Sequence, residues 1–92
     1  MAPRDDQGFT RSPDVVSRVL DGQAVLLDLE SSKYLGLNDV ATRVWELLGE
    51  GQALGAIRAA LLQEFEVPPE VLTRDLEHLV AEMLARGLIR AA

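Results

Sequence analysis

Few side chains of this chain could take part in bond-making chemistry. The 92 residues include no cysteine and a single histidine, His78, and the fifteen Asp and Glu carboxylates are scattered. The lack of cysteine excludes disulfides, thiolate metal sites and cysteine nucleophiles. One histidine does not make a metal site, and no nucleophile, base and orienting group stand together. The sequence therefore argues against a small enzyme and predicts neither a metal nor another cofactor.

The polar groups with a more evident binding role belong to the backbone of a short hairpin. Residues 24–29 alternate as in a strand, Glu30-Ser31-Ser32 predicts a turn, and Lys33 to Leu37 forms the returning strand. Apolar residues between Val15 and Leu20 predict an earlier strand, which Asp21-Gly22 ends as a turn. A sheet of three antiparallel strands has edges whose unpaired N–H and C=O groups can accept a strand from another chain.

Two helices are predicted directly after the hairpin. Asn38 is a good N-cap, and apolar residues then recur at helical spacing until Gly49. A second helix runs from about Leu54 to Glu64. Its start is weak, because Gln52 is a poor cap and Gly55 costs ~1 kcal/mol relative to Ala.

The third predicted helix, from about Pro69 to Arg86, has a wide apolar face. Pro69 suits a first helical turn, where its missing N–H is not needed. At ~100° per residue the apolar side chains cover an arc of roughly 200°, about twice the stripe that packing on one side requires. They are Val71, Leu72, Leu76, Leu79, Val80, Met83 and Leu84. Either the helix packs on both other helices and the sheet, or part of the arc lines a groove.

The charge balance argues against nucleic acid as a partner. The formal net charge is −6, whereas binding to a phosphate backbone depends on Lys and Arg. A winged-helix DNA-binding protein is the alternative that the helical half suggests, but it would need a basic recognition helix. The third helix instead carries Glu70, Asp75, Glu77 and Glu82 against Arg74 and Arg86.

No segment of the sequence indicates export or a membrane. No apolar run approaches ~18 residues, and the N-terminal segment is polar. We therefore expect a cytoplasmic protein without a membrane partner. Residues 1–13 show neither helical nor strand periodicity and are expected to form a flexible tail, whereas residues 14–90 are expected to form one domain.

Four segments in this order resemble the PqqD-like family over about Val15 to Ile89. They are GQAVLLDLESSKYLGLN, ATRVWELLGEG, IRAALLQEFEVPPE and RDLEHLVAEMLARGLI. Members of this family are peptide-recognition domains of ribosomal peptide natural-product (RiPP) pathways, also called RiPP recognition elements. The resemblance implies an α+β fold, with a three-stranded antiparallel sheet followed by a three-helix bundle like a winged helix-turn-helix.

The resemblance also implies how such a domain binds its peptide. The leader segment of a precursor peptide adds as a further strand, and its side chains lie in the groove between the third strand and the third helix. Carried over to this sequence, the peptide-binding residues are Lys33, Tyr34, Leu35, Gly36, Leu37, Val71, Leu72, Asp75, Leu76, Leu79 and Met83.

The implied function is that of a non-catalytic accessory protein. It would hold the leader for a separate processing enzyme, such as a leader peptidase, a cyclase or a radical SAM enzyme. The hairpin resembles more closely the free-standing leader-binding proteins of lasso peptide pathways. The alternative is a chaperone of the pyrroloquinoline quinone type, which presents a precursor to a radical SAM enzyme.

Two positions depart from the family pattern, and two others are expected not to contact the peptide. Ser32 stands where a turn glycine is common, and Gln52 stands where a Thr or Ser cap is common. Trp45 is expected to anchor the core, and His78 to project away from the groove. Leu35→Asp or Leu76→Asp is expected to weaken leader binding without unfolding the domain.

Overall fold

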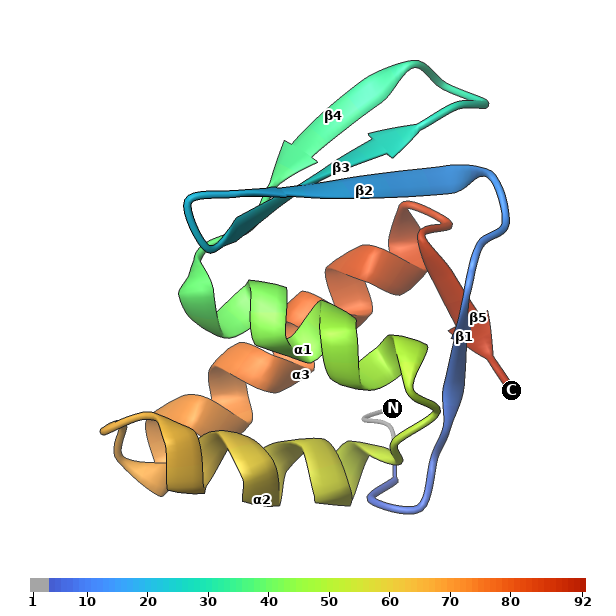
Figure 1. The fold of residues 1–92 in the computed structure, drawn as a ribbon. Helices are drawn as coiled ribbons and strands as arrows, with labels where there is room; N and C mark the ends of the chain where they lie inside the picture. Colours follow the sequence, from blue (N-terminus) through green and yellow to red (C-terminus); the bar gives the residue numbers. More distant parts are fainter. Residues whose placement is uncertain (1–3) are drawn as a thin grey trace.

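A three-stranded sheet lies over a bundle of three helices, and a two-stranded ribbon closes one side (Figure 1). This computed structural model describes residues 4–92. The elements are β1 Phe9–Arg11, β2 Val15–Leu20, β3 Gln23–Asp28, β4 Lys33–Gly36, α1 Asp39–Gly49, α2 Leu54–Glu64, α3 Pro69–Ala85 and β5 Ile89–Ala91. The α+β architecture predicted from the sequence is confirmed, and the ribbon of β1 and β5 is an addition to it.

The larger sheet is antiparallel throughout, in the order β2-β3-β4. The β2–β3 turn consists of Asp21 and Gly22, both with positive φ (53° and 81°), as the favoured two-residue hairpin requires. In the second hairpin Leu26 pairs with Leu35 and Leu27 with Tyr34. Strand β4 is therefore an edge strand of this sheet.

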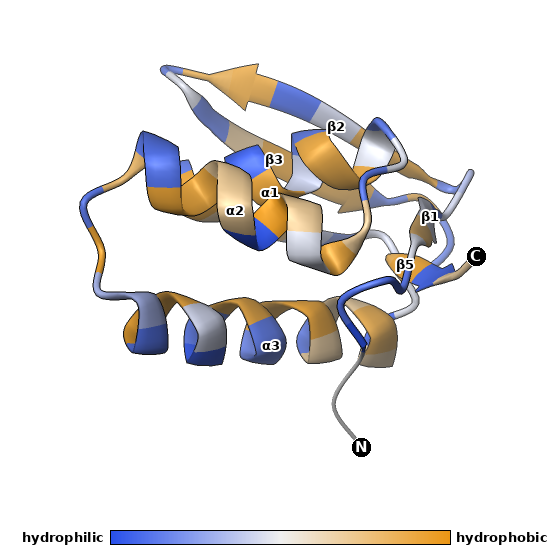
Figure 2. Cartoon of the chain, turned by 90° about the horizontal axis from the view of Figure 1, so that it is seen from below, coloured by the Kyte–Doolittle hydropathy of each residue, from blue (hydrophilic) through white to orange (hydrophobic). Residues whose placement is uncertain are grey.

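The core lies between the sheet and the helices. Ala24 and Leu26 face it from β3 and are each 1% exposed. On α3 the core residues are Leu72, Leu76, Val80 and Met83. Figure 2 shows the apolar side of α3 turned toward the other elements and its polar side turned outward. Most of the wide apolar arc of α3 is thus explained by contact with the core.

Helix α1 begins as the sequence predicts and is tied to the sheet. The Asn38 side chain accepts a hydrogen bond from the Ala41 N–H (2.8 Å), which caps the helix. The buried Thr42 hydroxyl accepts another from the Ala24 N–H of β3 (2.8 Å). This hydrogen bond holds α1 in a fixed position against β3.

Helix α2 has no side-chain cap of its own. The N-terminal segment supplies backbone carbonyls instead, since Gln7 accepts from the Leu54 N–H (3.0 Å) and Asp5 from the Gly55 N–H (2.8 Å). A Cβ atom on Gly55 would lie 3.0 Å from the Cβ of Asp5. The glycine that weakens the helix in isolation therefore admits the segment that caps it.

The expectation that residues 1–13 lack regular structure is wrong for Phe9–Arg11. This strand, β1, pairs antiparallel with β5 near the other end of the chain, and Phe9 lies in the core. A three-residue strand is too short to show a periodicity, and its partner is distant in sequence. Residues 1–3, which belong to the same expected tail, lie outside the described residues.

Within residues 4–92, no helix has both the length and the apolar character needed to cross a lipid bilayer.

Candidate peptide-binding site

The free edge of β4 carries unpaired backbone groups. The Leu37 N–H donates to the Ala24 carbonyl of β3 (2.8 Å). Because antiparallel strands bond through alternate residues, Lys33 and Leu35 also direct their backbone groups toward β3. Tyr34 and Gly36 then direct their N–H and C=O groups away from β3, along the free edge. Four backbone groups are therefore presented to an added strand.

An apolar cavity of about 340 Å³ lies below this edge between α1 and α3. We call it the α1–α3 pocket. Apolar side chains form most of its wall, and Asp75 and His78 of α3 are its ionisable residues. It is lined by Asn38, Val40, Ala41, Val44, Leu61, Val67, Leu72, Asp75, Leu76, His78 and Leu79.

A second cavity of about 380 Å³ lies between β4 and the end of α3, and we call it the β4–α3 pocket. Lys33 and Leu35 reach it from the helix-facing side of the strand. Its charged residues are Asp28, Lys33 and Arg86. It is lined by Leu26, Asp28, Ser31, Lys33, Tyr34, Leu35, Ala85, Arg86 and Leu88. The β4–α3 pocket follows β4 from Lys33 to Leu35, whereas the α1–α3 pocket has no β4 residue in its lining and reaches the chain just after β4, at Asn38.

The structure brings seven of the eleven predicted peptide-binding residues to these pockets. Leu72, Asp75, Leu76 and Leu79 line the α1–α3 pocket, and Lys33, Tyr34 and Leu35 line the β4–α3 pocket. Gly36 and Leu37 line a different hollow, beside Leu20 and Val25. Val71 is half-buried and lines neither pocket.

Four of the predicted residues are core residues in this structure, and two of them, Leu37 and Met83, line neither of these pockets. Met83 is fully buried and Leu37 is 5% exposed, so neither offers its side chain to a peptide. Leu76 lines a pocket but is only 2% exposed. An Asp at position 76 would therefore place a charge in the core, so the expectation that Leu76→Asp leaves the fold intact is wrong on physical grounds.

Sequence reasoning missed several residues of the α1–α3 pocket. Val40, Ala41 and Val44 come from α1, and no residue of this helix was predicted to bind the peptide. His78 is exposed as expected, yet it lines this pocket and does not project away from it. Its spacing of three residues from Asp75 was the available signal, because residues i and i+3 are neighbours on a helix.

Trp45 is buried, which confirms its role in the core. In the described part of the chain, no group of three or more His, Asp or Glu residues is placed to hold a metal ion. The arrangement can therefore supply backbone pairing, apolar pockets and a few charges at their rims.

Comparisons with known proteins show a family and two solved structures that this chain resembles. The family described as coenzyme PQQ synthesis protein D (PqqD) matches residues 23–89. A structure of TbiB1 in complex with the TbiA(beta) leader peptide is similar, with 33% identity and a TM-score of 0.81, covering 88% of this chain and 94% of that one. Another, lasso peptide synthetase B1 complexed with the leader peptide, has 29% identity and a TM-score of 0.79, covering 89% and 96%.

A comparison with curated proteins gave no significant match. The family match nevertheless spans far more than half of the chain and includes β3, β4 and all three helices. This chain therefore belongs to the PqqD family.

Proposed function

We propose that this protein captures the leader segment of a ribosomally made precursor peptide as an added strand on β4. The observation that carries the proposal is the free β4 edge beside two pockets of α3. Two proteins that share the fold are described as bound to a leader peptide. The likeness to the lasso peptide synthetase B1 favours a lasso peptide pathway over the pyrroloquinoline quinone pathway.

Backbone pairing alone would not give adequate affinity or specificity. A strand of about five residues adds a few hydrogen bonds, each contributing ~0.5–1.5 kcal/mol net, and association costs at least ~4 kcal/mol. Side chains that alternate along the added strand must therefore supply the rest. The α1–α3 pocket, which the half-buried Leu79 lines, suits a large apolar leader residue. The half-buried Leu35 lines the β4–α3 pocket.

In this proposal the domain is an accessory binding protein and catalyses nothing. It raises the effective concentration of the precursor at a separate leader peptidase or cyclase by holding the leader. A radical SAM enzyme is the corresponding partner in the alternative pathway. We place the protein in the cytoplasm, where ribosomal precursors are made.

The test is a titration of a fluorescein-labelled synthetic leader, whose sequence is to be read from a short precursor gene sought among the genes next to the one for this protein. Fluorescence polarisation is recorded for the wild type, Leu35→Asp and Leu79→Asp. We expect each variant to lose about tenfold or more in affinity, because a carboxylate would replace an apolar contact.

Leu84→Asp is the matched control, because Leu84 is an exposed leucine of the same helix that lines neither pocket. Circular dichroism melts confirm that all variants are folded. Equal affinities in all four folded proteins would refute leader binding in this groove.

A further inference from the structure

The groove along β4 carries different charges at its two ends. At one end, Asp75 is the only Asp, Glu, Lys or Arg among the described residues that line the α1–α3 pocket. At the other end, Lys33 and Arg86 line the β4–α3 pocket. We propose that the Lys33 and Arg86 end selects an acidic side chain of the leader, and that this contact fixes the direction and register of the leader on β4. This inference rests on the proposed function.

The two cations are available to a ligand. Lys33 and Arg86 are exposed, and neither takes part in an ion pair with any of the residues 4–92. The third charged residue of this pocket is Asp28, which lies opposite Lys33 in the hairpin. Its Oδ1 accepts a hydrogen bond from the Glu30 N–H (3.0 Å), so this oxygen is engaged in the turn. Two cations and one carboxylate leave this end positive in a chain whose net charge is −6.

Two independent lengths give the separation of the ends. Lys33 and Asn38 line opposite pockets and are five positions apart, which corresponds to about 16–17 Å of extended chain. Asp75 and Arg86 are eleven positions apart along α3, which corresponds to about 16–17 Å of helix. An added strand covers this length in about five residues. Because its helix-facing side chains alternate, the acidic residue lies four or six positions from the apolar residue in the α1–α3 pocket.

The charge difference also disfavours the reversed peptide. If the leader lay in the opposite direction, its acidic residue would lie away from Lys33 and Arg86 and would approach Asp75, a carboxylate whose Oδ1 lies 3.9 Å from the Arg74 Nε. Backbone pairing does not read side-chain order, so the charges at the two ends provide the discrimination.

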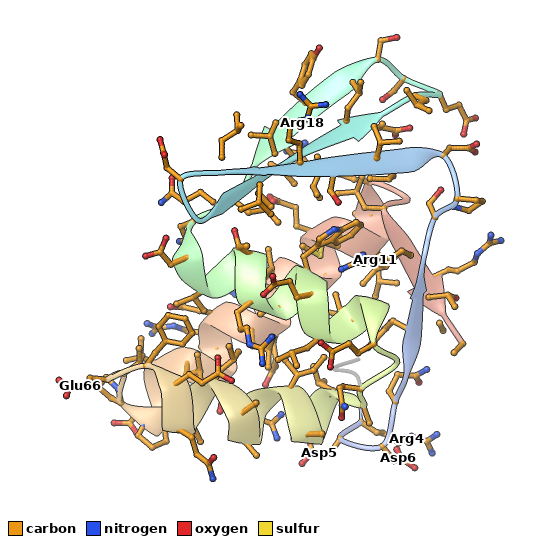
Figure 3. The ribbon with its side chains drawn as sticks, in the orientation of Figure 1. Arg4, Asp5, Asp6, Arg11, Arg18 and Glu66 are labelled. Carbon is orange, nitrogen blue, oxygen red and sulfur yellow. The ribbon has the colours of Figure 1, made fainter. Side chains whose placement is uncertain are left out.

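The test is a selection of random 16-residue peptides by mRNA display. The baits are the wild type, the double variant Lys33→Glu/Arg86→Glu and the control Arg18→Glu/Arg90→Glu. The control makes the same change in net charge outside both pockets. Figure 3 shows Arg18 on the side of the sheet that is turned away from the helices.

We expect wild type and control to select a large apolar residue with Asp or Glu four or six positions away. The double variant should keep the apolar residue and select Lys or Arg at the second position. In fluorescence polarisation, changing the acidic residue of a selected peptide to Lys should weaken wild-type binding by about fivefold or more, and the double variant should reverse that preference.

An apolar consensus without an acidic preference would overturn this inference and leave the proposed function standing. So would an acidic preference that persists in the double variant. A selection without any apolar consensus would overturn both the inference and the proposed function.

Discussion

The guanidinium of Arg11 lies 4.4 Å from the centroid of the Trp45 ring and donates hydrogen bonds to the carbonyl of the same residue. The side chain of Arg11, which is labelled in Figure 3, thus stacks on the core aromatic of α1 and satisfies a backbone oxygen in that helix. Burial lowers the pKa of Arg11, and the nearby Glu46 carboxylate opposes that shift. Arginine stays protonated throughout the working pH range, so the contact persists. It secures the N-terminal segment that caps α2.

Arg11→Ala should therefore destabilise the fold. The variant loses a partly desolvated cation–π contact and the hydrogen bonds to the Trp45 carbonyl, so we expect a loss of about 1–3 kcal/mol. Urea unfolding followed by tryptophan fluorescence measures this directly. Arg90→Ala is the control, because Arg90 is an exposed arginine on the paired strand β5. Equal stability of Arg11→Ala and wild type would show that the contact contributes nothing net.

Gly49→Ala should act through the same arginine. A methyl group on Gly49 would overlap the Arg11 guanidinium, so the side chain would have to leave its place on Trp45. We expect a loss similar to that of Arg11→Ala in the wild-type background, and none in the Arg11→Ala background. A double-mutant cycle in urea measures the coupling. Additive effects would mean that the two positions do not share one contact.

Thr42→Val should cost about 1–3 kcal/mol. The shape of the side chain is kept, but the buried N–H of Ala24 loses its acceptor. Thr42→Ser retains the hydroxyl and serves as the control for the lost hydrogen bond. Chemical denaturation of the three proteins tests this, and a Val variant as stable as Ser would exclude a structural role for the bond.

Tyr34→Pro should weaken leader binding while the fold persists. The Tyr34 N–H faces the free edge, where proline is tolerated, but proline removes the donor that an added strand needs. We expect a loss of about tenfold or more in affinity relative to Tyr34→Ala, which keeps the N–H and removes the same ring. Polarisation titrations with the labelled leader compare the two variants. Equal affinities would argue against strand addition at this edge.

Local sequence signals predicted the main elements of this fold closely. Three of these signals satisfy a backbone requirement within a few residues and can therefore be predicted from the sequence. They are the Asp21-Gly22 turn, the Asn38 cap and the start of α3 at Pro69. The small number of strands required a free edge, and the family resemblance assigned the peptide to the third strand, which is the edge strand β4 in the structure. These are the features from which the family resemblance also arose.

Contacts between segments that lie far apart in the sequence could not be predicted from local signals. Strand β1 pairs with a partner about eighty residues away, and Gly55 makes sense only beside Asp5. A sequence pattern likewise shows that α3 is apolar over a wide arc, but not which leucines are buried. Leu76 and Leu79 look equivalent on the helix, yet Leu76 is a core residue and Leu79 is half-buried.

By itself, the sequence determined the order of the elements from β2 to α3 and the acidic charge. Turns, caps and periodicity depend on neighbouring residues, and charge depends on composition alone. Only the tertiary structure decided that α1 and His78 contribute to the α1–α3 pocket and that Lys33 and Arg86 line the same β4–α3 pocket. Those relationships depend on how helices and strands pack across the core, and packing joins residues whose separation along the chain carries no local signal.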